Sequence, residues 1–203
     1  SLRSPHTIGL YDFGVAQDGT FFLVMEMLEG IDTELLVERF GPQPPERVAH
    51  LLRQACHSLE EAHQRGLIHR DIKPSNIFTC RMGLEVDFVK VLDFGLVKAQ
   101  GEGDREEQLL TAPNATAGTP AFIAPEVALG TTPIDHRVDI YALGCVAYWL
   151  LTGQLVFEAR NAMQQLLLHI NEPPVPPSRR MELPIPPALD DLVLACLAKR
   201  PAD

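Results

Sequence analysis

The stretch His69-Arg70-Asp71-Ile72-Lys73-Pro74-Ser75-Asn76 gathers several groups suited to phosphoryl transfer in one short loop. Phosphoryl transfer requires an oriented hydroxyl group, neutralisation of the spreading negative charge, and Mg²⁺ held against the phosphates. The Asp71 carboxylate can accept the hydroxyl proton, and the Lys73 ammonium can meet the transferring phosphate as a point charge. The Asn76 amide oxygen is a hard ligand that suits Mg²⁺. This order of residue types predicts a phosphoryl-transfer loop.

A second carboxylate follows in Asp93-Phe94-Gly95, directly after the apolar run Val89-Lys90-Val91-Leu92. Such a run predicts a strand that delivers Asp93 to the same metal. The tripeptide Asp12-Phe13-Gly14 is identical, but it precedes the loop and falls inside a predicted hairpin, so we interpret it as structural. A single tripeptide is weak evidence, because short motifs recur by chance.

A third segment, Gly118-Thr119-Pro120-Ala121-Phe122-Ile123-Ala124-Pro125-Glu126, completes an ordered set. The three segments resemble the catalytic loop H-R-D-x-K-x-x-N, the magnesium loop D-F-G and the G-T-P-x-[YF]-x-A-P-E segment of eukaryotic-type protein kinases, in their bacterial (Hanks-type) serine/threonine form. The resemblance covers nearly the whole chain. It implies an α+β, protein-kinase-like fold, with a mostly helical C-lobe and the last β-hairpin of the N-lobe.

The resemblance also implies the catalytic roles. Asp71 would orient and deprotonate the substrate hydroxyl while Lys73 meets the γ-phosphate. Asn76 and Asp93 would hold Mg²⁺ on ATP. The Thr119 hydroxyl would bond to the catalytic Asp and Lys, and Lys73 together with Thr119 favours Ser/Thr over Tyr substrates.

The stretch Met25-Glu26-Met27-Leu28-Glu29-Gly30 resembles the kinase hinge. By that resemblance, the Glu26 carbonyl and the Leu28 N–H would bond the adenine edge, and Asp32 would reach the ribose. Phe78 falls where the family places an apolar floor beneath adenine. Backbone contacts tolerate any side chain, so these assignments depend on position in the chain.

Residues 96–124 are charged and punctuated by glycine, with little apolar periodicity, which is typical of a mobile segment. The resemblance places the activation loop here. Thr116 is the first candidate for phosphorylation and Thr111 the second. Arg70 and Lys98 could then pair with the phosphate and order the loop. The alternative is that these threonines are only solvated.

Composition excludes several classes of partner. The net charge of −10 and the scattered Lys and Arg residues argue against nucleic acid and against direct contact with an anionic membrane. The four cysteines form no C-x-x-C pair, which favours free thiols in a reducing compartment. No apolar run reaches the length of a membrane span. We expect a cytoplasmic segment, which could belong to a longer, membrane-anchored protein, with ATP and a protein substrate as partners.

Periodicity and turn residues predict the elements. Asp139 lies near the start of a predicted helix that is apolar nearly all round, and the resemblance implies that it braces the catalytic loop; a helix-cap role is the alternative. His69 is interpreted as a packing residue beside Phe94, and His63 as a surface or boundary residue. The prolines between Pro173 and Pro187 favour a connector over an SH3 ligand.

The predicted elements are hairpins at 7–15 with 20–27 and at 77–80 with 86–92, and helices at 33–40, 45–65, 137–152 and 188–198.

We expect residues 1–203 to be one protein kinase domain truncated at both ends, with 1–28 a remnant of the N-lobe and hinge and 29–203 the C-lobe. The Gly-rich loop and lysine strand of the family would precede residue 1, so the fragment alone is expected to be inactive. One alternative is a catalytically silent kinase-like module that binds nucleotide or partners, but the full set of catalytic residues argues against it. The other is a small-molecule phosphotransferase of kinase-like fold, which the Ala-Pro-Glu segment and the long loop disfavour.

Overall fold

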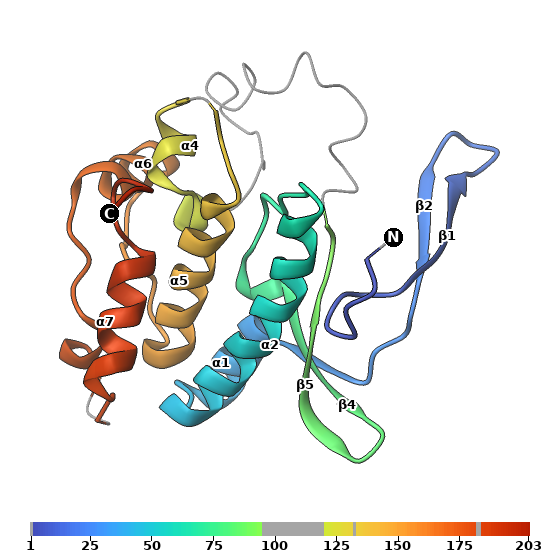
Figure 1. The fold of residues 1–203 in the computed structure, drawn as a ribbon, viewed down its shortest axis with the longest axis horizontal. Helices are drawn as coiled ribbons and strands as arrows, with labels where there is room; N and C mark the ends of the chain where they lie inside the picture. The colour runs from blue at the N-terminus through green and yellow to red at the C-terminus, as the bar shows by residue number, and fades with distance from the viewer. Residues whose placement is uncertain (1, 95–119, 132, 182–183) are drawn as a thin grey trace.

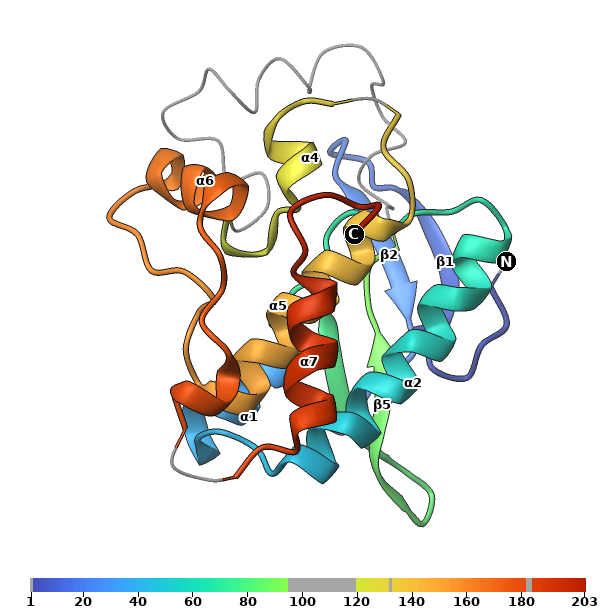
Figure 2. The same ribbon diagram turned by 60° about the vertical axis from the view of Figure 1, so that its left-hand side comes forward.

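The computed structural model describes residues 2–94, 120–131, 133–181 and 184–203, which form an α+β fold. A helical body lies on one side, and a hairpin of β1 (Leu10–Val15) and β2 (Phe21–Met25) stands on the other (Figure 1). Helix α5 (Arg137–Thr152) runs through the body between α2 (Pro45–Gln64) and α7 (Pro187–Cys196) (Figure 2). Within the described residues, no helix is long and apolar enough to cross a membrane.

A second sheet connects the hairpin to the helices, with strands in the antiparallel order β3-β4-β5. The short strand β3 was not expected from the sequence. It depends on Gly30, because a Cβ there would collide with the Thr79 carbonyl oxygen of β4. The remaining elements are β3 (Gly30–Asp32), α1 (Thr33–Phe40), the 3₁₀ turns η1 (Pro74–Asn76), η2 (Pro120–Phe122) and η3 (Pro177–Arg179), β4 (Ile77–Met82), β5 (Glu85–Val91), α4 (Pro125–Ala128) and α6 (Ala162–Asn171).

The long helices follow their apolar patterns. Pro45 opens α2 at a position where its missing N–H costs nothing, and Gly66 follows the helix with a φ of 74°. Helix α5 is buried nearly all round and ends at Gly153, whose N–H bonds to the Trp149 carbonyl in a left-handed cap. The buried stripe of α2 consists of Val48, Leu51, Ala55, Leu59 and Ala62.

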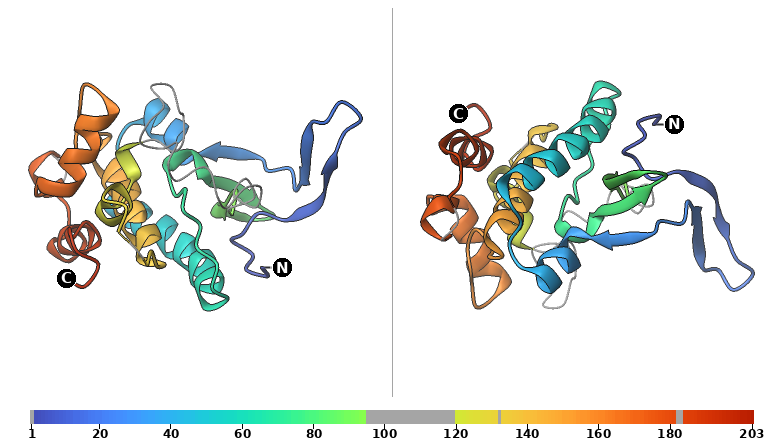
Figure 3. Two further views of the ribbon diagram at one scale, coloured as in Figure 1. Left: turned by 90° about the horizontal axis from the view of Figure 1, so that it is seen from above. Right: turned by 90° about the horizontal axis from the view of Figure 1, so that it is seen from below.

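The first hairpin is shorter than the sequence predicts. Residues 7 and 8 pair with β5 instead, since Thr7 forms a parallel bridge with Val91 and the Ile8 N–H bonds to the Val91 carbonyl at 3.0 Å. The segment Asp12-Phe13-Gly14 lies within β1, which agrees with its interpretation as a structural part of the hairpin. Seen from above and below, the hairpin extends away from the helical body (Figure 3). Its large apolar side chains are exposed on both faces: Leu10, Tyr11, Phe13, Val15, Phe21, Phe22, Val24 and Met25.

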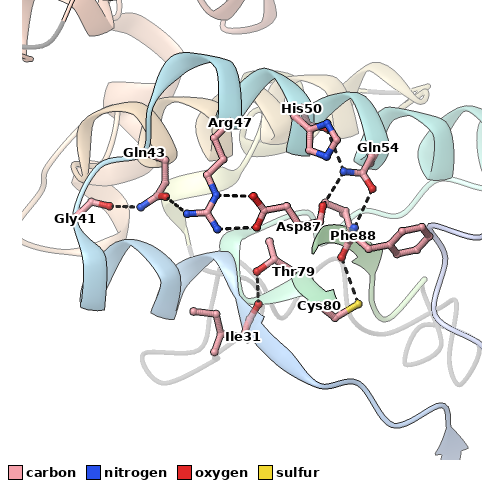
Figure 4. Close-up of polar contacts among 11 residues, drawn as sticks. Ile31, Gly41, Gln43, Arg47, His50, Gln54, Thr79, Cys80, Asp87 and Phe88 are labelled. Atoms are coloured by element: carbon pink, nitrogen blue, oxygen red, sulfur yellow. Dashed lines mark hydrogen bonds and ion pairs between the residues drawn. The ribbon is translucent and has the colours of Figure 1, made fainter. Parts of the chain in front are cut away.

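Polar contacts fix β5 against α2 (Figure 4). The Arg47 guanidinium donates to both carboxylate oxygens of Asp87, at 2.8 and 2.6 Å. The Gln54 amide donates to the Asp87 carbonyl at 2.8 Å and accepts from the Val89 N–H at 3.1 Å. Asp87 has a φ of 55°, a conformation that costs free energy in a non-glycine residue unless its surroundings hold it. These bonds therefore set the register of the strand that leads to Asp93.

Helix α6 carries a fully buried histidine, His169. Burial, and secondarily the charge of Lys199, lower the pKa of His169 to about 4 from an ordinary value of 6.5. The folded protein therefore holds the ring neutral over a range of pH in which the unfolded chain binds a proton.

This difference predicts an acid-sensitive stability. Above pH 6.5 the ring is neutral in both states, so it adds no pH dependence. As the pH falls from 6.5 towards 4, protonation favours the unfolded chain, and the unfolding free energy should fall by up to about 3 kcal/mol. Urea unfolding at a series of pH values should show this fall in the wild type and a smaller one in His169→Gln. The exposed control His50→Gln should keep the wild-type slope; an unchanged slope in His169→Gln would contradict the assignment.

Candidate active site

Three of the four predicted catalytic residues, Asp71, Lys73 and Asn76, converge in the loop between α2 and β4. The Asp71 Oδ2 atom accepts from Lys73 Nζ at 2.9 Å and from Asn76 Nδ2 at 3.0 Å, and Asn76 Nδ2 also donates to the Asp71 carbonyl at 2.8 Å. The Asp71 side chain is 39% exposed, and its Oδ1 atom has no hydrogen-bond partner among the described residues. One carboxylate oxygen is thus fixed by the protein while the other can accept a proton from a bound hydroxyl.

Short-range bonds hold the loop in shape. Pro74 opens the 3₁₀ turn η1, which closes with the Asn76 N–H bonded to the Lys73 carbonyl at 3.0 Å. The Thr33 hydroxyl at the start of α1 donates to the Pro74 carbonyl at 2.8 Å. Ile72 is buried in the core beneath the loop. The polar residues of the loop therefore project from a backbone that is anchored on both sides.

Asp139 braces the same loop from α5. Its Oδ2 atom accepts from the His69 N–H at 2.8 Å and from His63 Nε2 at 2.7 Å, and its Oδ1 atom accepts from the Arg70 N–H at 2.8 Å. The carboxylate is 1% exposed, and Arg70 adopts a φ of 64° above it. The N-cap of α5 is His136, so the cap role for Asp139 is wrong and the brace is confirmed. The contact of His63 with this carboxylate was missed, because nothing local in the sequence marks it.

His69 packs, as expected, and is also a structural hydrogen-bond donor. Its ring lies 4.7 Å from that of Phe94, its Nε2 atom donates to the Leu92 carbonyl at 2.7 Å, and its Nδ1 atom accepts from the Asp71 N–H at 3.3 Å. Burial lowers the pKa of His69, although the Leu92 carbonyl and nearby carboxylates oppose the shift. The ring is therefore neutral, with its proton on Nε2.

These contacts place Asp93 beside the loop. The Leu92 N–H donates to the Asn76 carbonyl at 2.9 Å, and the Leu92 carbonyl accepts from the His69 ring. Both backbone groups of Leu92 are therefore bound to the loop. Asp93 follows with a φ of 56° and an exposed side chain. Only a supporting structure keeps a non-glycine residue in this region, and such residues concentrate at functional sites.

The donor atoms available here fit Mg²⁺. Among the described residues, both hydrogen bonds of the Asn76 amide use its nitrogen, which leaves its oxygen free for a ligand, and Asp93 adds a carboxylate. No group of three or more His, Cys, Asp or Glu side chains suited to a metal occurs in the described part of the chain. Mg²⁺ needs no such cage, since it binds one or two protein oxygens and completes its shell with phosphate oxygens and water.

The predicted nucleotide residues lie on β3, β4 and the preceding segment. Asp32 and Phe78 are direct partners across the β3–β4 ladder, so the structure brings these two together. One Asp32 oxygen caps α1 by accepting from the Leu35 N–H at 2.8 Å. Phe78 is partly exposed, and Leu28 is partly buried.

The Glu26 side chain is held by protein contacts that the sequence did not reveal. Its Oε1 atom accepts from Lys90 Nζ at 2.6 Å and from the Gly9 N–H at 2.7 Å. Although burial opposes it, this pairing holds the pKa of Glu26 below its usual value. The side chain thus ties the segment before β3 to β5, and the Glu26 carbonyl is the group left for the predicted adenine contact.

Four predicted site residues, Lys98, Thr111, Thr116 and Thr119, lie outside the described residues. Their roles stay predictions. Arg70, which precedes Asp71 in the chain, is described and exposed. The described end of the third motif forms η2 and α4.

Comparison with known proteins agrees with this geometry. The model of the family described as protein kinase domain matches residues 1–203. The chain is 41% identical to the serine/threonine-protein kinase pkn3 of Myxococcus xanthus over all of its length and 37% of the relative's. It is 38% identical to the serine/threonine-protein kinase PknB of Mycolicibacterium smegmatis, over 99% of the chain and 31% of that protein. The chain thus spans about a third of the length of these curated relatives.

Solved structures agree on the fold. The Mycobacterium tuberculosis PknI kinase domain superposes with a TM-score of 0.71 at 27% identity, over 99% of this chain and 67% of that one. Residues 1–466 of Rad53, solved in complex with AMP-PNP, give a TM-score of 0.74 at 27% identity, over 99% of this chain and 48% of that one. The α+β, kinase-like fold predicted from the sequence is therefore confirmed.

Proposed function

Since this chain belongs to the protein kinase domain family, together with bacterial serine/threonine kinases, we propose that it carries the phosphotransfer site of a protein serine/threonine kinase. The observation that carries the proposal is the cluster of Asp71, Lys73 and Asn76, in which two protein donors hold one Asp71 oxygen and the other has no hydrogen-bond partner among the described residues. Residues 29–203 correspond to the C-lobe in this proposal, and residues 1–28 to the end of the N-lobe and the hinge.

Asp71 acts on the acceptor hydroxyl. Its open oxygen accepts the hydroxyl hydrogen bond, orients the nucleophile and takes the proton as the bond to phosphorus forms. Lys73 and Asn76 fix the angle of the carboxylate through Oδ2. The Lys73 ammonium also places a positive charge close to the developing phosphate charge, since it lies 2.9 Å from Asp71.

Asn76 and Asp93 hold Mg²⁺ through their side-chain oxygens in this proposal. The chemistry supplied by MgATP is a γ-phosphoryl group with its leaving group already activated by the metal. The Glu26 carbonyl, the Leu28 N–H, Asp32 and Phe78 hold the nucleoside. The Rad53 structure with AMP-PNP supports a nucleotide of this class.

The acceptor is a serine or threonine of a protein. The relatives pkn3 and PknB, both named serine/threonine-protein kinases, support this class, as does Lys73 in the loop. Thr119 completes the acceptor side by bonding Asp71 and Lys73. Arg70 and Lys98 would bind a phosphate on Thr116, or on Thr111, and so order the loop before catalysis.

An acceptor screen tests the proposal. The full-length protein is incubated with γ-labelled MgATP and with a generic protein or a panel of hydroxylated small molecules, including aminoglycosides. We expect label on serine and threonine of protein and none on the small molecules. Label confined to the small molecules would indicate a small-molecule phosphotransferase, and a folded protein that binds MgATP without transferring label would be a silent nucleotide-binding module.

A further inference from the structure

A buried histidine lies beneath the described end of the third motif. His169 on α6 is fully buried, and α6 packs against both η2 and α4. Figure 2 shows α6 and α4 side by side, with α5 below them. The residues of η2 directly follow Thr119, which the proposed function assigns to the acceptor side of the site. A group that fixes η2 can therefore influence the acceptor hydroxyl.

Helix α5 supplies a partner for this histidine. The Tyr141 hydroxyl lies 2.7 Å from His169 Nδ1. Burial raises the pKa of Tyr141 far above its ordinary value, so the phenol keeps its proton. Among the described residues the hydroxyl has no second hydrogen-bond partner, and its proton is best placed on Nδ1. The imidazole proton then resides on Nε2.

The Nε2 atom belongs to a ring on α6, the helix that packs against η2. It is buried, and it makes no well-formed hydrogen bond within the part of the chain that the structure describes. The backbone of Ala121 in η2 lies close enough to the ring to oppose the effect of burial on the pKa of His169. A buried N–H without an acceptor is costly, so this donor favours positions of η2 that bring the Ala121 carbonyl towards it.

The ring itself has little freedom to move. Phe157 packs edge-on against it, with ring centroids 5.0 Å apart and planes at 86°. Lys199 Nζ donates to the His169 carbonyl at 2.7 Å and lies 4.5 Å from the Phe157 ring centre. Gln165 Nε2 donates to the Phe157 carbonyl at 2.6 Å. The imidazole is thus a fixed donor, and the position of η2 must adapt to it.

We propose that Tyr141 and His169 are positioning residues for the protein acceptor. The Tyr141 hydroxyl determines the tautomer of the imidazole, and the His169 Nε2–H group determines the position of the Ala121 carbonyl and of the η2 backbone. The inference rests on the proposed function, because it concerns the acceptor side of that site. It separates the acceptor side from the nucleotide side, whose residues lie in the segment before β3, on β3 and β4, and just after β5.

A matched pair of tyrosine variants of the full-length protein tests the positioning role. Tyr141→Phe removes only the hydroxyl that bonds His169. Tyr148→Phe removes a hydroxyl from the same helix that is buried and has no hydrogen-bond partner among the described residues. We expect Tyr141→Phe to lower kcat/KM for the protein acceptor by about five- to tenfold, the effect of one hydrogen bond, and to leave the Kd for MgATP unchanged. Tyr148→Phe should change neither; equal effects of the two variants would overturn the proposal.

A second readout does not depend on phosphate transfer. The ¹⁵N NMR shifts of His169 should report an Nε2–H tautomer in the wild type and a mixture in Tyr141→Phe, with faster amide hydrogen exchange at residues 121–124 in the variant. An Nδ1–H tautomer in a wild type that transfers phosphate normally would overturn the relay and leave the proposed function standing. The expected tautomer in a protein that transfers no phosphate would overturn the proposed function and, with it, the positioning role.

Discussion

Replacing Asp139 with Asn is expected to lower the unfolding free energy by about 3 to 5 kcal/mol, the usual cost of breaking a buried charged network at one partner. The carboxylate is 1% exposed and accepts from two backbone N–H groups and from His63. An asparagine of the same shape turns an amide N–H₂ towards at least one of these donors. Donor then faces donor, and the bonds that remain lose the charge that strengthens them.

The same substitution should also reduce phosphate transfer, because Arg70 would lose the bond that supports its left-handed conformation next to Asp71. Urea unfolding of the wild type and Asp139→Asn measures the change in stability. Asp135→Asn is the control: Asp135 lies just before α5, is 43% exposed and pairs with Arg137 at the surface. Its effect should be below about 1 kcal/mol. A loss in Asp139→Asn no larger than in Asp135→Asn would show that the brace does not stabilise the loop.

Local signals in the sequence were sufficient for α1, α2 and α5, whereas the expected helix at 188–198 differs from α7 at both ends and α6 was not expected. The expected ranges 33–40 and 137–152 match α1 and α5 residue for residue. The reason is that both helices end at glycine, and α1 also begins at a capping aspartate. The range 45–65 exceeds α2 by one residue, which is the usual uncertainty where a helix ends in a turn.

Pairings between distant parts of the chain could not be predicted from periodicity. The bridge from Thr7 to Val91, the strand β3 and the ion pair of Glu26 with Lys90 each join segments far apart in the sequence. A side-chain pattern indicates which face of a strand is buried, but it does not specify the strand beside it. The expected first strand therefore began too early, at residue 7 instead of Leu10.

The candidate site likewise combines residues that the sequence predicted with contacts that it did not. The residue types of the loop were sufficient to predict Asp71, Lys73 and Asn76 as one cluster, and the structure brings these side chains within hydrogen-bonding distance. The role of Asp139 came only from the family resemblance, since an aspartate near a helix start ordinarily suggests a cap. His63 joins that carboxylate from another helix, and a histidine near the end of an amphipathic helix carries no signal of such a contact.

Replacing Asp71 with Asn is expected to lower the rate of phosphate transfer by about 10²- to 10⁴-fold, the contribution typical of a positioned general base. An asparagine keeps the shape of the side chain and retains an oxygen that can accept from Lys73, so the loop should persist. It cannot accept the hydroxyl proton at neutral pH. The Kd for MgATP should stay close to the wild-type value, because the proposed nucleotide contacts come from other residues.

The most direct test is the transfer of labelled γ-phosphate from MgATP to protein serine and threonine by the full-length wild type, beside Asp71→Asn and the control Asp18→Asn in the β1–β2 turn. We expect labelled protein with the wild type and the control. Asp71→Asn should lose nearly all transfer of label at unchanged MgATP affinity. Equal transfer by the wild type and Asp71→Asn, or no transfer by a folded wild type that binds MgATP, would contradict it.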